Sequence, residues 1–240
     1  MKNIRIKVWA FVRFVPVYII GCFLGIMLLV LRGLRIWKIE GLENLPTLEE
    51  KGDRGLLLVS NHPSLLDPLV LIGFFFPWYA FSPLRYGPWN MAEQKNYRRG
   101  LFALMEPRLV FLDRDDPSSG MKSFRKAKGL LEGGSIFILF AEGGRTFKGI
   151  PKELILETNG RKIRPFNAGA GLLATQTDAI TVPVWIDGTD AVCPNLQVAR
   201  YTLPRFWKRV RISFGKRMEF ADSVRAKEGT GQLQTAVLGA

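Results

Sequence analysis

Residues 55–76 read GLLLVSNHPSLLDPLVLIGFFF. The first six form a short apolar run followed by polar turn residues, which is typical of a buried strand. The two prolines in the polar part exclude one continuous helix, so we expect a turn at residues 63–66. Asp67 would then be the N-cap of a helix over Pro68–Phe76, with the proline in its first turn. A strand, a turn and a helix in this order predict an α/β fold.

The rest of the chain repeats this alternation. Four more apolar runs have the length and bounding turns of strands: Leu109–Asp113, Ser135–Phe140, Ile180–Ile186 and Val210–Phe214. Two segments between them suit helices: Ser118–Leu131 and Asn167–Thr177. The 240 residues allow one domain and an anchor. We therefore expect an α/β domain over residues 39–240, with a mixed, mainly parallel sheet flanked by helices.

An apolar segment precedes this domain. Phe14–Leu31 contains no charged residue, and as a helix it would be about 27 Å long, slightly short of the hydrocarbon core of a membrane. The following LRGLRIWK has no small-residue cleavage site, which argues against a signal peptide. We expect residues 1–38 to be a helical membrane-anchoring segment. Pro16, Gly21 and Gly25 leave open whether it spans the membrane or bends within one leaflet, and the two glycines also fit a weak helix-dimer motif.

Basic charge is concentrated beside this segment. The chain has 34 Lys and Arg against 21 Asp and Glu, a formal net charge of +13. Residues 1–39 hold seven of the basic residues and no acidic one. A nucleic-acid-binding protein more often carries its charge on the folded domain, so the pattern favours an anionic membrane surface and no nucleic acid. A later basic group is expected to face solvent or lipid headgroups: Arg205, Lys208, Arg209 and Arg211.

His62 is the only histidine in the chain. Imidazole is the side chain most used as a general base near neutral pH. A carboxylate bonded to one ring nitrogen fixes the tautomer and leaves the other nitrogen as the base, and the turn could fold Asp67 back beside His62. From these two residues alone, a loop histidine and an ordinary N-cap are the simpler interpretation. One histidine and two cysteines without zinc spacing predict no metal site.

Three more segments carry an arginine, paired glycines or a proline at or near the ends of predicted strands. Arg114 follows a predicted strand, at the end where α/β sheets bind ligands. In Phe140–Thr146, paired glycines let a ligand approach the backbone, and Arg145 offers a fork for phosphate. Pro183 marks a strand edge, a bulge or a bend, because proline is disfavoured in a central strand. Each segment taken alone could be an ordinary turn or surface pair.

Taken together and in order, these segments resemble the glycerolipid acyltransferase family. That family is marked by an NHx4D block, a GxxFIxR block, an FPEGTRS-like block and a VPV block. They appear here as NHPSLLD (61–67), RLVFLDR (108–114), FAEGGRT (140–146) and VPV (182–184). One such block is weak evidence, whereas four in order behind a basic apolar anchor form a specific pattern.

The resemblance implies acyl transfer from acyl-CoA or acyl-carrier protein to the free hydroxyl of 1-acyl-glycerol-3-phosphate (lysophosphatidic acid), which makes phosphatidic acid. His62 would be the general base and Asp67 its orienting partner, with no metal or redox cofactor. The expected location is a membrane, with the domain on its cytoplasmic face (in a bacterium, the inner membrane). The motifs imply two further groups of residues: Arg114, Glu142, Gly143, Gly144, Arg145 and Thr146 to bind the acceptor and its phosphate, and Asn61, Phe111 and Pro183 to shape the acyl or acceptor site.

The blocks depart from the family pattern at four positions. Arg108 stands for a glycine, and Ala141, Gly144 and Thr146 stand for proline, threonine and serine. These changes leave the acceptor open among lysophosphatidic acid, another lysophospholipid and a lyso-aminolipid. A non-catalytic lipid-binding module is the alternative from a different class. A lipase or thioesterase is disfavoured because the chain has no GxSxG elbow.

Overall fold

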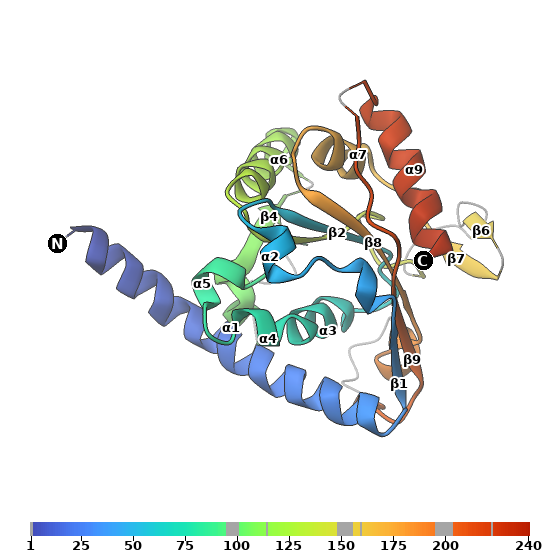
Figure 1. Cartoon of the computed structure of the whole chain (residues 1–240), viewed down its shortest axis with the longest axis horizontal. Coiled ribbons are helices and arrows are strands. Elements are labelled where there is room, and N and C mark those ends of the chain that lie inside the picture. Colours follow the sequence, from blue (N-terminus) through green and yellow to red (C-terminus); the bar gives the residue numbers. More distant parts are fainter. Residues whose placement is uncertain are drawn as a thin grey trace.

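The computed structural model describes residues 2–94, 101–113, 115–147, 156–158, 160–194, 204–221 and 223–240. Within these residues the main sheet has seven strands in the order β1-β9-β8-β2-β5-β3-β4, and Figure 1 shows them between two layers of helices. The strands of this sheet are β1 (Trp37–Glu40), β2 (Leu56–Ser60), β3 (Trp89–Glu93), β4 (Leu109–Leu112), β5 (Ile136–Phe140), β8 (Ile180–Asp187) and β9 (Val210–Phe214). Neighbours run parallel except for β8 and β9. The predicted mixed, mainly parallel sheet is confirmed.

Helices cover both faces of the sheet. The first face carries α1 (Lys2–Gly33), α3 (Asp67–Phe74), α4 (Phe76–Tyr79) and α5 (Pro83–Tyr86). The second face carries α6 (Pro117–Glu132), α7 (Ala168–Thr175) and α9 (Ala226–Gly239). The remaining short elements are η1 (Leu42–Asn44), α2 (Leu48–Lys51), η3 (Leu101–Arg108), the antiparallel pair β6 (Leu156–Thr158) and β7 (Arg161–Ile163), and α8 (Thr189–Val192).

Strand β2 lies at the centre of the sheet and is buried along its whole length. Its residues alternate between the two faces, so that Leu56 and Leu58 belong to the core under α1 and α3, while Leu57 and Val59 belong to the core under α7 and α9. Ser60, its last residue, pairs with residues of both neighbouring parallel strands, β5 and β8. The carboxyl ends of these strands therefore meet at one edge, which brings the NHPSLLD and FAEGGRT segments together.

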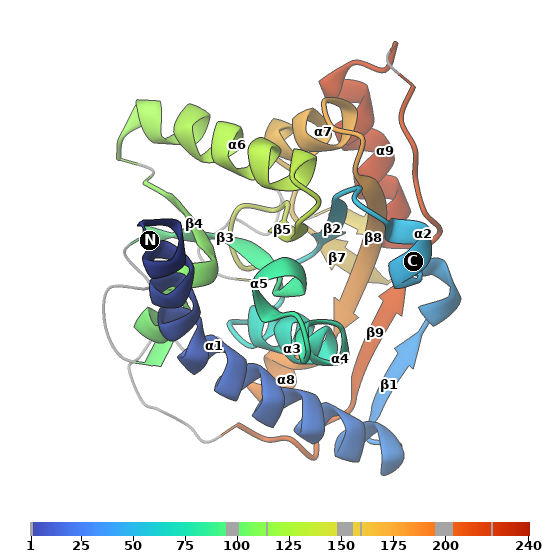
Figure 2. The same ribbon diagram turned by 60° about the vertical axis from the view of Figure 1, so that its left-hand side comes forward.

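Helix α1 lies along α3 and α4 on the first face, as Figure 2 shows. One side of the helix is buried in the core, through Phe14, Val17, Leu24, Leu28 and Leu31. Small residues allow the close approach. A Cβ on Gly73 of α3 would lie 2.7 Å from the Cβ of Leu24, and a Cβ on Gly21 would lie 1.7 Å from the hydroxyl of Tyr79. The glycines of the weak helix-dimer motif thus pack against other helices of the same chain.

Pro183, which is expected to mark an edge, a bulge or a bend, lies where the regular pairing of β8 with β9 ends. The residue lies inside β8, between β9 and β2, and is buried. Its carbonyl accepts a hydrogen bond from the Gly215 amide at 2.8 Å, and Gly215 is the first residue after β9. The missing N–H of the proline therefore falls at the end of the β8–β9 ladder, where proline costs little. The expected edge, bulge or bend is therefore a local irregularity, in which Pro183 to Thr181 faces the longer segment from Gly215 to Met218, in a strand that is otherwise central.

Candidate active site

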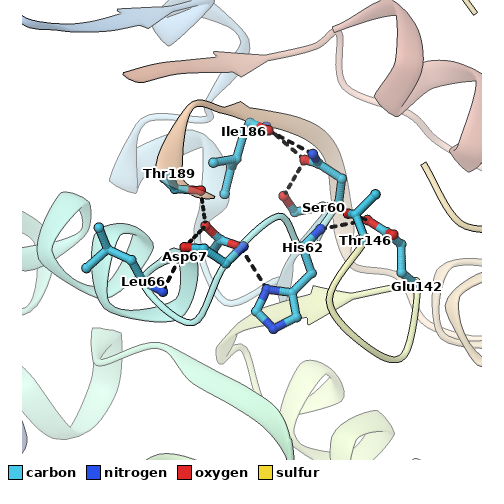
Figure 3. Close-up of polar contacts among 10 residues, drawn as sticks. Ser60, His62, Leu66, Asp67, Glu142, Thr146, Ile186 and Thr189 are labelled. Atoms are coloured by element: carbon cyan, nitrogen blue, oxygen red, sulfur yellow. Dashed lines mark hydrogen bonds and ion pairs between the residues drawn. The ribbon is translucent and has the colours of Figure 1, made fainter. Parts of the chain in front are cut away.

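His62 and Asp67 form a hydrogen-bonded pair, called the dyad below, at the carboxyl end of β2. The distance from His62 Nδ1 to Asp67 Oδ2 is 2.8 Å. The Asp67 side chain is fully buried, whereas the imidazole keeps 14% of its surface exposed and stacks on the ring of Phe140 with a centroid distance of 4.3 Å. In Figure 3 the second ring nitrogen points away from Asp67. A carboxylate only accepts, so the bond to Asp67 favours a proton on Nδ1, and in the neutral imidazole Nε2 is then the nitrogen that can act as a base.

Asp67 also accepts hydrogen bonds from groups other than His62. Oδ2 also accepts from the Ser64 amide at 2.8 Å, and Oδ1 accepts from the Ser64 hydroxyl at 3.3 Å and from the Thr189 hydroxyl at 2.5 Å. The predicted turn therefore does fold the aspartate back beside the histidine. The predicted N-cap is displaced by one residue, because α3 begins at Asp67 itself and Leu66 occupies the cap position. The carboxylate binds the turn and the imidazole instead of the helix amides.

Asn61 joins the end of β2 to β8. Its Nδ2 donates to the carbonyl of Ile186 at 2.7 Å, and its Oδ1 accepts from the Ile186 amide at 2.8 Å. This side chain imitates one rung of a sheet ladder and is buried. Asn61 is thus buried, and its side chain holds the backbone directly before His62 in place against β8.

Glu142 connects the two loops of the site. Its Oε1 accepts from the His62 amide and from the Thr146 hydroxyl, both at 2.7 Å, and its Oε2 accepts from the Arg164 amide at 3.0 Å. The Thr146 amide donates back to the His62 carbonyl at 2.8 Å. Burial raises the pKa of Glu142, although these hydrogen bonds act in the opposite direction. Both carboxylate oxygens are thus bonded within the chain and hold the loop that carries His62.

The FAEGGRT loop brings a positive charge to the same edge. Gly143 has φ of +67°, and a Cβ there would lie 2.2 Å from Nδ2 of Asn167, so only glycine fits. Burial lowers the pKa of Arg145, with opposing effects from Cys193 and Asp67 and a like-charge contribution from Arg164. Arg145 therefore lies within electrostatic range of the dyad and of a second arginine. Arg164 was not found from the sequence, because it follows β7 in a segment without a motif.

The remaining predicted residues have different outcomes. Arg114 lies outside the residues that the structure describes. Phe111 packs against the core cluster that contains Phe140, on the His62 side. Pro183 alternates with Val182 and Val184, which belong to that same cluster, and so points to the opposite face of the sheet. The structure does not bring Pro183 to the dyad.

Arg108 does not contribute its charge to this site. Its guanidinium lies 4.6 Å from the ring centroid of Phe14 and 4.9 Å from that of Trp89, and it donates to the Pro83 carbonyl at 2.8 Å. Burial lowers its pKa to about 10. The arginine that stands for a family glycine thus fastens α1 to the sheet.

Known proteins match this chain over most of its length. A family model described as "Acyltransferase" matches residues 36–187. The chloroplast 1-acyl-sn-glycerol-3-phosphate acyltransferases LPAT1 of Arabidopsis thaliana and BAT2 of Brassica napus are each 27% identical, over 79% and 65% of this chain. The chain spans only 42% and 39% of their lengths.

A solved structure has the same fold. The 1-acyl-sn-glycerophosphate (LPA) acyltransferase PlsC of Thermotoga maritima superposes with a TM-score of 0.57, covering 85% of this chain and 70% of that one at 22% identity. The family model covers more than half of the chain and includes both the His62–Asp67 pair and the Glu142 loop. The chain therefore belongs to the acyltransferase family.

Proposed function

We propose that this protein transfers an acyl chain from a thioester donor to the free hydroxyl of lysophosphatidic acid, which makes phosphatidic acid. The observation that carries the proposal is the His62–Asp67 pair, with Nδ1 held by a buried carboxylate at 2.8 Å and Nε2 directed away from it, in a chain of the acyltransferase family. Acyl-CoA and acyl-carrier protein are the two proposed donors. The proposed reaction uses neither a metal nor a redox cofactor.

The proposed reaction needs one base and no covalent enzyme intermediate. His62 Nε2 takes the proton of the acceptor hydroxyl while that oxygen attacks the thioester carbonyl carbon. The C–S bond then breaks, the thiolate leaves, and the imidazolium returns a proton to it. Asp67 stabilises the transient imidazolium through its bond to Nδ1. The buried Asp67 and the stacked Phe140 ring keep the base in one orientation throughout.

Two arginines support an acceptor with a phosphate. The positive charge of Arg164 lowers the pKa of Arg145, and the negative charge of Asp67 raises it. A guanidinium binds a phosphate through two parallel hydrogen bonds, and Gly143 and Gly144 keep the neighbouring backbone accessible to a ligand. The two chloroplast relatives are named for 1-acyl-glycerol-3-phosphate, which favours that acceptor over other lysolipids. Arg114 remains a predicted contributor to this site.

We also propose that residues 1–38 attach the protein to a membrane. Val12–Gly33 is long and apolar enough to cross one, with a mean hydropathy of 2.6. Its outer side is an apolar stripe opposite the buried one, and the exposed residues that form it are Val12, Val15, Ile19, Phe23, Ile26, Leu29 and Val30. Trp37 and Lys38, which the sequence assigns to the anchor, begin β1 and belong to the sheet.

The packing of α1 favours an orientation within one leaflet. Its inner stripe is fastened along the domain from Phe14 to Leu31, so the helix cannot cross a bilayer unless the domain enters it. The outer stripe can enter the headgroup and acyl region while the domain stays in water. Three exposed basic residues suit anionic headgroups: Arg32 in the last turn of the helix, Arg35 just beyond it and Lys38 in β1. Acyl thioester donors are made in the cytoplasm, so the proposed side is the cytoplasmic one.

A radiolabelled transfer assay tests the reaction. Membranes with the full chain are given labelled acyl-CoA or acyl-carrier protein, with lysophosphatidic acid or a panel of other lysolipids. Labelled phosphatidic acid made by the unmutated protein and lost in His62→Ala supports the proposal. Label in another lipid moves the acceptor to that class, and no label with either donor would favour a lipid-binding module.

A further inference from the structure

Thr189 contacts the dyad from a distant segment of the chain. It is the first residue of α8, two positions beyond the end of the family match, and it is fully buried. Its hydroxyl donates to Oδ1 of Asp67 at 2.5 Å, across 122 residues of sequence. Figure 3 shows this bond on the side of the carboxylate away from the imidazole. Thr189 is not part of any of the four motif blocks.

The contact settles which way the carboxylate faces. An aspartate carboxyl can rotate about its last bond, because that torsion is soft. Oδ2 is held by His62 and by the Ser64 amide. Oδ1 is held by Thr189 and, at the longer distance of 3.3 Å, by the Ser64 hydroxyl, which also accepts from the Leu66 amide. The bond from the Thr189 hydroxyl is therefore the shorter of the two that Oδ1 accepts.

The backbone around Thr189 is itself fixed. Gly188, the residue before α8, has φ of +81°, and a Cβ there would lie 2.2 Å from the carbonyl oxygen of Arg209. The backbone before α8 therefore packs closely against the backbone just before β9. Val192, one turn later, is fully buried in the core of the first face. The hydroxyl is thus held by an element that does not depend on the turn at residues 63–66.

We propose that Thr189 is a positioning residue for acyl transfer, which holds the Asp67 carboxylate so that His62 keeps its proton on Nδ1 and its open nitrogen toward the acceptor. This inference rests on the proposed function for its effect on turnover. The position of the proton on His62 can be measured without any substrate, so the two can fail separately.

The variants are chosen to separate the hydroxyl from its volume. Thr189→Val keeps the shape and removes the donor, and Thr189→Ser keeps the donor. If valine prevents folding, Thr189→Ala replaces it. Thr181→Val is the matched control, because Thr181 is an equally buried threonine at the opposite end of β8, where its hydroxyl makes only a 3.4 Å contact with Ala179.

Two measurements are made on the full chain in detergent micelles. The first is kcat and KM for the lysolipid. We expect Thr189→Val to lower kcat about tenfold or more, because a buried hydrogen bond to a charged group is lost, with KM changed about twofold at most. The second is the nitrogen spectrum of the imidazole, which is unambiguous because His62 is the only histidine. We expect Thr189→Val to increase the share of the tautomer protonated on Nε2. Thr189→Ser and Thr181→Val should resemble the unmutated protein in both.

Each combination of results decides the inference. An unchanged spectrum in Thr189→Val overturns it, even if kcat falls, because the hydroxyl then has only a structural role. A changed spectrum with unchanged kcat also overturns it, as does a serine variant that behaves like valine. If the unmutated protein transfers no acyl group to any lysolipid, the proposed function fails, and the spectrum alone decides whether Thr189 positions the dyad.

Discussion

Asp67 and Glu142 collect hydrogen bonds from segments that are far apart in sequence. Asp67 joins the turn before α3 to α8, and Glu142 joins the loops after β2, β5 and β7. His62 and Asp67 could be predicted because they lie in one local segment with recognisable turn chemistry. Thr189 could not, since its importance comes from a contact 122 residues away and no local pattern announces such a contact.

His62→Ala is expected to lower the rate of acyl transfer by at least about 10²-fold while membrane binding and folding persist, because general base catalysis typically contributes that much. Asp67→Asn should cost less turnover if the carboxylate only orients and stabilises the ring. Its amide would also place a donor against one of the groups that now donate to it, so thermal unfolding must be measured beside kcat. Retained turnover in His62→Ala would disprove the base assignment.

Glu142→Gln is expected to show the cost of an ionised carboxylate in the core. Burial raises the pKa of Glu142 above its usual 4.5, so the native state binds this proton more readily than the unfolded chain. The stability that this group contributes is fully present below the usual pKa and is lost as pH rises through the raised one. Glutamine does not titrate, so the gap in Tm between the unmutated protein and the variant should narrow as pH rises above 4.5.

The matched control for this series is Glu132→Gln, at an exposed position on α6, and its Tm difference should follow a different pH course. A gap that widens with pH for Glu142→Gln would mean that the three hydrogen bonds to the carboxylate outweigh its burial. In either case kcat should fall in Glu142→Gln, because glutamine has one acceptor oxygen instead of two, and its NH2 group would face an amide that now donates to Glu142, from His62 or from Arg164.

Among the secondary-structure elements, regular apolar patterns were predictable and mixed ones were not. The strands β2, β5 and β8 are buried apolar runs and were expected within a residue or two. Strand β1 reads WKIE and β3 reads WNMAE, which lack a clear strand pattern. Helix α9 contains three glycines among its 14 residues, and glycine lowers helix propensity. Tertiary packing of Leu233 and Val237 stabilises it instead.

Two substitutions of glycine by alanine are expected to change stability in opposite directions, one in the contact between α1 and α3 and the other on α6. A Cβ at Gly73 would lie 2.7 Å from the Cβ of Leu24 and 2.9 Å from its carbonyl carbon. Gly73→Ala should therefore destabilise the protein by about 1–3 kcal/mol, as overpacking does. Gly120 on α6 has open space around its Cβ position, so Gly120→Ala should stabilise by up to about 1 kcal/mol. Thermal unfolding in one detergent measures both, and a stabilising Gly73→Ala would contradict the helix contact.

The whole molecule has two different outer surfaces. One is the apolar outer stripe of α1, on the same face of the sheet as α3 and α4. The other is formed by α6, α7 and α9 on the opposite face (Figures 1 and 2). The sequence predicted an apolar anchor but could not distinguish a spanning helix from one that lies in a leaflet. That distinction depends on the inner stripe being covered by the domain, which is a property of the tertiary structure. Removal of α1 would uncover the core instead of simply releasing the domain.

Two charges on the outer stripe are expected to release the protein from lipid. Ile19 and Phe23 are 61% and 67% exposed on α1, and Met121 on α6 is 55% exposed. Ile19→Glu with Phe23→Glu should lower binding to vesicles of anionic phospholipid at least tenfold, because a charge costs up to about 2.5–3.5 kcal/mol within the apolar region. Met121→Glu is the control and should bind normally. Thermal unfolding checks that the double variant remains folded.

The orientation of α1 can be measured separately with sealed vesicles. If the helix lies within one leaflet, epitope tags at both ends of the chain stay on the same side, and protease added outside removes either both or neither. A spanning helix would protect one tag and expose the other, which would contradict the packing of the inner stripe. Because that stripe includes Phe14 and Leu31, both of them buried in the core, a spanning arrangement would also expose the first core cluster. Thus, even if vesicle binding is lost in the double variant, the tag result alone decides whether α1 serves as a surface of the α/β domain or as an independent anchor.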